Sequence, residues 1–96
     1  MNKLDEKSIS ERLPSLKGWS FDNNKFIRNF KLDSFSDAVA FVVKIAIESE
    51  KIDHHPDIRL FGWNNVEVTL QTHSVNGITE NDFKLANSIN ILYSHG

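Results

Sequence analysis

Residues 35–57 read FSDAVAFVVKIAIESEKIDHHPD, and this stretch decides how the rest of the chain is organised. From Phe35 to about Lys51 the apolar side chains recur at helical spacing. Pro56 cannot continue a helix, and it holds His55 in extended backbone. The stretch therefore predicts one long helix that ends in a rigid turn carrying two adjacent histidines.

The segments on either side of this helix alternate between apolar and polar residues, as half-buried strands do. Before the helix, a hairpin is predicted around the turn residues Asp22-Asn23-Asn24, with Phe26 and Phe30 on its apolar face. After the helix, Ile58 to Phe61 predicts a third strand and the alternation from Val66 to Gln71 predicts a fourth.

Two further helices are predicted near the ends of the chain. Asp5 to Leu13 is amphipathic and is ended by Pro14. Thr79 and Asp82 resemble a capping box, and the apolar residues of 83–92 follow them at helical spacing.

The element order is helix, two strands, helix, two strands, helix. Strand pairs joined by turns favour an antiparallel sheet, and helices cover its apolar side. We therefore predict an α+β fold in which three helices pack on one face of a four-stranded antiparallel sheet. A chain of this length forms one domain, residues 1–96.

Composition excludes several classes of function. The net charge of -2 and the lack of a basic cluster argue against nucleic-acid binding. Because there is no cysteine, disulfides, thiol nucleophiles and cysteine zinc sites are excluded. No apolar run resembles a signal peptide or a membrane span, so we predict a cytoplasmic protein without membrane contact.

His54 and His55 are the first candidates for chemistry, because imidazole can give or take a proton near neutral pH. Asp53 and Glu50 precede them and can fix the tautomer of such a ring. Pro56 directs the two rings away from each other. The alternative is a solvated turn in which the histidines only cap the C-terminus of the helix.

A third histidine, His73, favours a functional site over a solvated helix cap. The alternation of the fourth strand, if continued, places His73 on the polar face with Gln71, where it can reach the end of the long helix. Three imidazoles with carboxylates form either a proton-transfer site or a metal site. Metal is the weaker alternative, because adjacent histidines in an extended turn diverge.

Glu50 is unusual because helical projection places it within the apolar arc, between Val39 and Val43. A carboxylate on an apolar face needs a partner or a function. Either the last helical turn frays and releases Glu50 into water, or Glu50 faces a substrate or a histidine.

The chain resembles the pterin-4a-carbinolamine dehydratases from about Leu13 to Leu92. The matching pieces, in the family's order and spacing, are Gly18-Trp19, Glu50-Lys51-Ile52-Asp53-His54-His55-Pro56, Trp63-Asn64, Thr72-His73 and Gly77-Ile78-Thr79-Glu80-Asn81-Asp82.

The resemblance implies an enzyme, a hydro-lyase that removes water from a 4a-hydroxytetrahydropterin and gives the quinonoid dihydropterin. Such an enzyme recycles the pterin cofactor of aromatic amino-acid hydroxylases and needs no metal or other cofactor itself. Histidines suit this reaction, because an acid must protonate the departing hydroxyl and a base must take the N5 proton. The alternative function is a non-catalytic dimerisation partner of a transcription factor.

The resemblance also assigns roles to residues. His54 and His73 act on the hydroxyl and His55 holds the pterin, while the other matching positions bind substrate or orient the rings: Trp19, Glu50, Asp53, Gln71, Thr72, Ser74 and Asp82. Trp19 is equally a core residue and Asp82 equally a helix cap. Ser74 departs from the family, which often has an acid there.

The long helix predicts an obligate homo-oligomer, a homodimer or a homotetramer. Its apolar side chains span an arc of about 260°, whereas a helix on one sheet needs only about 100° or somewhat more. The same helix of a partner, related by a two-fold axis, is the simplest cover. Members of the resembled family assemble as dimers and tetramers.

Overall fold

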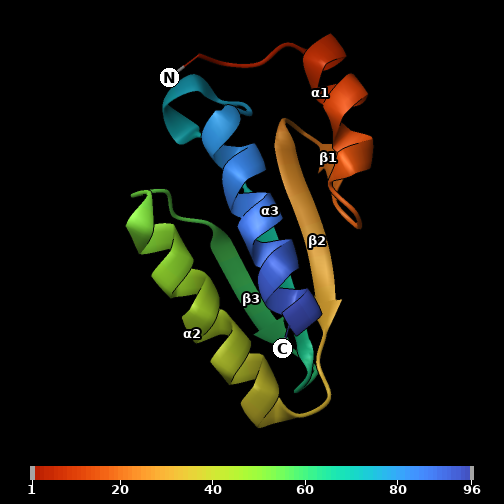
Figure 1. Ribbon diagram of the computed structural model, residues 1–96, viewed down its shortest axis with the longest axis vertical. Coiled ribbons are helices and arrows are strands. Elements are labelled where there is room, and N and C mark those ends of the chain that lie inside the picture. The colour runs from red at the N-terminus through yellow and green to blue at the C-terminus, as the bar shows by residue number, and fades with distance from the viewer. Residues whose placement is uncertain (1, 96) are drawn as a thin grey trace.

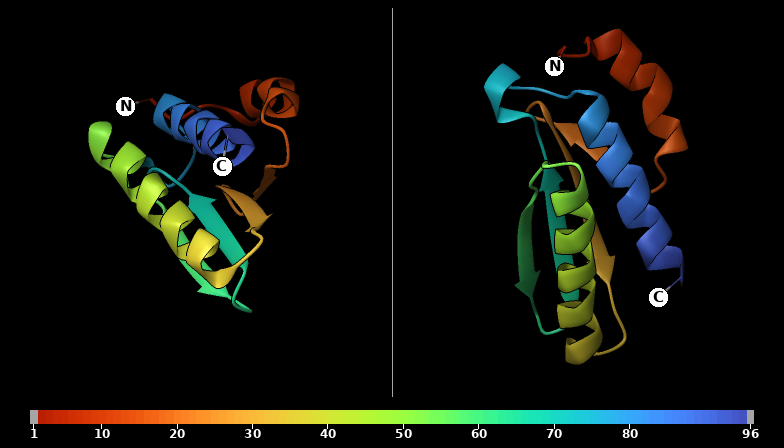
Figure 2. Two further views of the ribbon diagram at one scale, coloured as in Figure 1. Left: turned by 60° about the horizontal axis from the view of Figure 1, so that its bottom comes forward. Right: turned by 60° about the vertical axis from the view of Figure 1, so that its left-hand side comes forward.

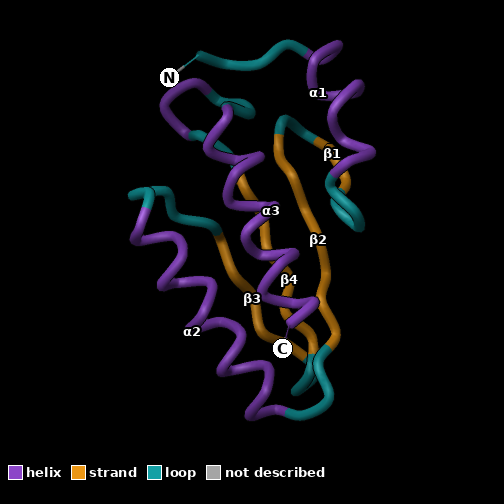
Figure 3. Tube along the Cα trace, in the orientation of Figure 1, coloured by secondary structure: helices purple, strands orange, loops and turns teal. Residues whose placement is uncertain are grey.

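A computed structural model describes residues 2–95 and confirms the predicted order of elements (Figures 1 and 3). Two single turns of 3-10 helix, η1 and η2, accompany the regular elements. In chain order these are α1 (Glu6–Arg12), η1 (Leu13–Ser15), β1 (Ser20–Asp22), β2 (Lys25–Lys31), α2 (Phe35–Lys51), β3 (Asp57–Phe61), β4 (Asn65–Leu70), η2 (His73–Val75) and α3 (Glu80–His95).

The four strands form one antiparallel sheet in the order β1-β2-β4-β3. Its central pair is β2 and β4, with Phe26 opposite Leu70 and Phe30 opposite Val66. All three helices lie on the same side of the sheet, as the left view of Figure 2 shows. The predicted α+β class and the one-sided packing are both confirmed.

Local sequence explains the two best-predicted boundaries. Asn23 and Asn24 form the β1–β2 turn with φ of 52° and 61°, a conformation that asparagine tolerates and that matches the twist of a two-residue hairpin. Ser34 caps α2, because its hydroxyl accepts a hydrogen bond from the backbone N–H of Asp37.

The core lies between the sheet and the helices. Alternate residues of β2 and β4 point into it, and α2 contributes Ala38, Phe41 and Ile45 from one face only. The opposite face of α2 is left uncovered by the chain itself: Val39, Val43 and Ile47 are 42%, 52% and 53% exposed. We call these three residues the outer stripe of α2.

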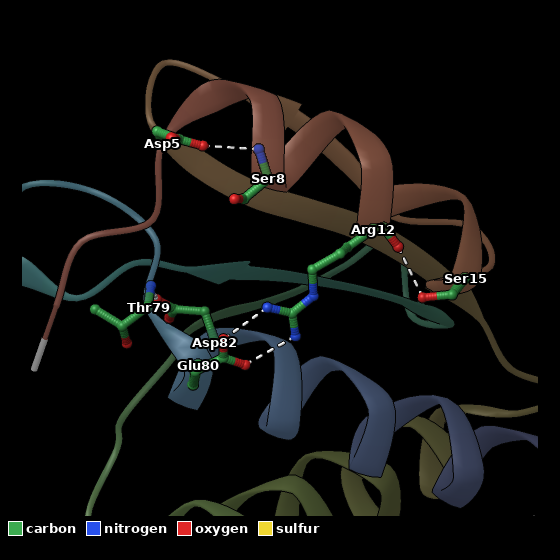
Figure 4. A network of polar contacts seen from close by, with 7 residues as sticks. All are labelled: Asp5, Ser8, Arg12, Ser15, Thr79, Glu80 and Asp82. Atoms are coloured by element: carbon green, nitrogen blue, oxygen red, sulfur yellow. Dashed lines mark hydrogen bonds and ion pairs between the residues drawn. The ribbon is translucent and has the colours of Figure 1, made fainter.

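The start of α3 is clamped to the end of α1 (Figure 4). The guanidinium of Arg12 donates two hydrogen bonds to the Glu80 carboxylate, at 2.6 and 2.8 Å, and lies 4.0 Å from the centre of the Phe83 ring. These hydrogen bonds lower the pKa of Glu80 from its ordinary value. The clamp fixes the helix that carries Asp82.

No helix within residues 2–95 combines the length and the apolar character that a membrane crossing requires.

Candidate functional site

His54 forms a short hydrogen bond with a fully buried carboxylate. Its Nε2 lies 2.6 Å from Oδ1 of Asp82, and the His54 side chain is 11% exposed whereas that of Asp82 is inaccessible. A buried carboxylate is stable only when its oxygens have partners. Oδ2 of Asp82 accepts hydrogen bonds from the Thr72 hydroxyl at 2.8 Å and the Thr79 backbone N–H at 2.9 Å.

Three distant segments supply this network. His54 follows the C-terminus of α2, Thr72 follows β4, and Asp82 lies in the first turn of α3. The hydroxyls of Thr72 and Thr79 are also 2.8 Å apart, which joins the two chain segments that flank η2. The network therefore ties the end of a helix, the end of a strand and the start of a helix at one end of the sheet.

His55 points the other way. Its side chain is 59% exposed, and its Nε2 lies 3.7 Å from Oε1 of Glu50, which is longer than a direct hydrogen bond. The prediction that the two adjacent rings diverge is confirmed, since His54 is enclosed and His55 faces solvent.

Glu50 belongs to a helical turn that does not fray, because α2 continues to Lys51. Its side chain is nevertheless 75% exposed. The side chain is exposed although the helix is intact, because the apolar arc between Val39 and Val43, where the sequence places Glu50, is on the uncovered side of α2.

The predicted position of His73 on the polar face of a continued strand is wrong. β4 ends at Leu70, Gln71 and Thr72 are both buried, and His73 begins η2. The chain leaves the sheet because the Gln71 amide turns inward to donate to the Asn24 carbonyl and the Asn76 side chain. His73 and Ser74 are both exposed on η2.

Trp19 lies in the hydrophobic core. It is 6% exposed, its ring packs edge-on against Phe30, and its Nε1 donates to the Asn90 side chain at 2.8 Å. A cavity of about 770 Å³ between α1 and β1 borders Trp19, but no histidine lines it. We therefore place the candidate site at the histidines and not at this cavity.

Thr79 is a member of the site that the sequence interpretation used only as a helix cap. Its backbone N–H binds Asp82, which is one half of a capping box. The Thr79-x-x-Asp82 spacing was the available signal, but the spacing alone does not show that Asp82 also reaches His54.

Within residues 2–95, no three His, Asp or Glu side chains lie close enough together to hold a metal ion. The metal-free mechanism remains a prediction.

Comparison with known proteins identifies the family. The family model described as pterin 4 alpha carbinolamine dehydratase matches residues 2–92. A protein of Sulfolobus acidocaldarius that carries this family's name is 47% identical over 88 residues, which are 92% of this chain and 96% of that one.

The solved structures similar to this chain include two that differ in how much they show. A crystal structure described as a transcriptional coactivator/pterin dehydratase from Brucella melitensis has a TM-score of 0.91 at 40% identity, over 96% of this chain and 99% of that one. A pterin dehydratase-like protein, described as a RuBisCO assembly factor of the alpha-carboxysome, shares the fold alone, with a TM-score of 0.63 at 24% identity over 78% and 86% of the chains. On the family model and the 47% identical relative, this chain belongs to the pterin-4-alpha-carbinolamine dehydratase family.

Proposed function

We propose that this protein is a hydro-lyase that dehydrates a 4a-hydroxytetrahydropterin to the quinonoid dihydropterin. The observation that carries the proposal is the His54–Asp82 pair, an imidazole held by a buried carboxylate next to the exposed groups of His55 and Glu50. The names of its relatives support the substrate class.

The reaction needs two proton transfers. An acid protonates the hydroxyl oxygen. The C4a–O bond then breaks, its electron pair stays on the oxygen, and water leaves. The N5–H bond gives its proton to a base, and its electrons form the C4a–N5 double bond. Each such transfer, made by a positioned side chain, contributes about 10²–10⁴-fold to the rate.

His54 and Asp82 suit proton transfer. With the Asp82 carboxylate as acceptor, Nε2 of His54 carries the shared proton, and Nδ1 is the ring nitrogen left to exchange a proton with the substrate. Asp82 is buried behind the ring, so it orients His54 and does not itself touch the pterin. Thr72 and Thr79 hold Asp82 in place.

The exposed groups bind the substrate and complete the transfer. His73 directly follows Thr72, so the network brings its segment to the same end of the sheet as His54. We assign His54 and His73 to the departing hydroxyl, and His55, Glu50 and Ser74 to the pterin. Gln71 supports the turn that carries His73.

The product is then available for reduction to the tetrahydropterin, so we propose a role in recycling the cofactor of aromatic amino-acid hydroxylases. We also propose that the protein is cytoplasmic. We propose a homodimer or homotetramer, because the exposed apolar outer stripe of α2 would be buried against a second copy. A non-catalytic dimerisation module is the second candidate. The same outer stripe suits it, but such a module has no use for a histidine on a buried carboxylate.

The proposed activity is tested by following the absorbance change as the carbinolamine dehydrates. Purified protein should accelerate it well above the buffer rate. Extended chelation before the assay is the control for metal, and activity should survive it with well under one metal ion per chain. A rate equal to that of buffer would refute the enzyme; stoichiometric zinc or iron, lost together with activity, would restore the metal alternative.

A further inference from the structure

We infer that Asp53 serves the site through its backbone and not through its carboxylate: its left-handed conformation aims His54 at Asp82. It is a positioning residue for the dehydration, and in that respect the inference rests on the proposed function. The matching family segment alone suggested a carboxylate that orients a ring or meets the pterin.

The backbone of Asp53 ends α2 with a sharp reversal. Its φ is 49°, in the left-handed region that disfavours most side chains. Around it, the His54 N–H donates to the Ser49 carbonyl at 3.1 Å, and the Asp53 N–H donates to the Glu50 carbonyl at 3.3 Å. This pair of bonds is the Schellman motif, with Asp53 at the position that glycine usually occupies.

The residue that anchors this reversal, Ser49, is itself fixed in α2. Ser49 is 2% exposed and its hydroxyl donates to the Ile45 carbonyl at 2.8 Å. His54 is thus bound by its backbone to a buried residue of α2 and by its ring to Asp82. A change of φ at Asp53 lies between these two attachments, so it would move the His54 ring away from the carboxylate or break the backbone bond.

The carboxylate of Asp53 has no comparable attachment. Asp53 is exposed, and among residues 2–95 its side chain makes no hydrogen bond or ion pair. Aspartate and asparagine tolerate the left-handed conformation better than other residues with a Cβ, and glycine tolerates it without strain. Backbone geometry is therefore sufficient to account for the residue at this position.

Three substitutions of Asp53 distinguish the role of its backbone conformation from the role of its carboxylate. Asp53→Asn and Asp53→Gly remove the charge but permit the left-handed turn, so both should keep kcat/KM within about threefold of wild type. Asp53→Val keeps neither the charge nor the turn, and it should lower kcat at least about tenfold with little change in KM. If both Asp53→Asn and Asp53→Gly lose activity through a raised KM, the carboxylate binds substrate and the inference is wrong.

A second measurement does not depend on dehydratase activity. The short His54–Asp82 hydrogen bond should give a strongly downfield proton resonance, assigned by its loss in His54→Gln. The resonance should persist in Asp53→Asn and Asp53→Gly and vanish in Asp53→Val, even if the protein proves inactive on pterins. If Asp53→Val does not fold, Asp53→Ala takes its place. A resonance that persists in a folded Asp53→Val or Asp53→Ala protein would overturn the inference.

Discussion

The His54→Ala variant is expected to lose at least about tenfold in kcat/KM for dehydration. The substitution removes the only imidazole that is both enclosed and held by a buried carboxylate among the histidines of the described chain. The loss should fall mainly on kcat, because in the proposed mechanism the exposed groups hold the pterin and His54 transfers a proton. His73→Ala should show a loss of similar size.

Stability must be separated from catalysis in this experiment. Without His54, Asp82 keeps its bonds from Thr72 and Thr79, but a buried acceptor that loses a partner costs about 1–3 kcal/mol and a charged one more. Rates should therefore be measured well below the unfolding temperature of the variant.

The matched control for both substitutions is His95→Ala. His95 is exposed at the end of α3, and removing it should change neither rate nor stability. A folded His54→Ala protein with wild-type kcat would show that proton transfer is carried by other groups.

The Val43→Glu variant is expected to be monomeric under conditions in which the wild-type protein sediments as a dimer or tetramer. Val43 is at the middle of the outer stripe of α2 and is 52% exposed in the single chain. If the stripe packs against a second copy, a two-fold axis places the new carboxylate of each copy in an apolar contact. Removing water from each carboxylate costs several kcal/mol. Sedimentation at low micromolar concentration is the measurement.

Lys84→Glu is the control for a change of charge alone. Lys84 is exposed on α3, away from the outer stripe, so its reversal should leave the oligomer intact. A wild-type protein that is a stable, active monomer at this concentration would contradict the prediction. So would a Val43→Glu protein that remains assembled.

The elements were predictable because their signals are local. The bounds of α2 follow from Ser34 at one end and the turn before Pro56 at the other, and β4 follows from strict alternation between Asn65 and Leu70. Alternation has no local end signal, however. It predicted that the strand would continue through Gln71, whose amide is instead satisfied by groups far away in the sequence or across a loop.

The sequence indicated His54 and Asp82 as candidate site residues, but it did not predict the contact between them. Asp82 carries a local cap signal, and that signal is correct, since it binds the Thr79 N–H. Its second oxygen reaches His54, 28 positions earlier, and only the packing of α3 beside α2 determines this contact. Sequence likewise left open whether Trp19 belongs to the core or the site, because an indole suits both, and its partner Asn90 is distant in sequence.

The clamp between Arg12 and Glu80 is an acid-sensitive contact between α1 and α3. Because hydrogen bonds from Arg12 lower the pKa of Glu80, their contribution is present above the ordinary pKa of 4.5 and is lost as pH falls through the lowered one. The same terminal segment bonds the site loop, where the Leu4 N–H donates to the Ile78 carbonyl beside Thr79. Partial unfolding in acid should thus begin with α1, and amide exchange should quicken there before it does in the sheet.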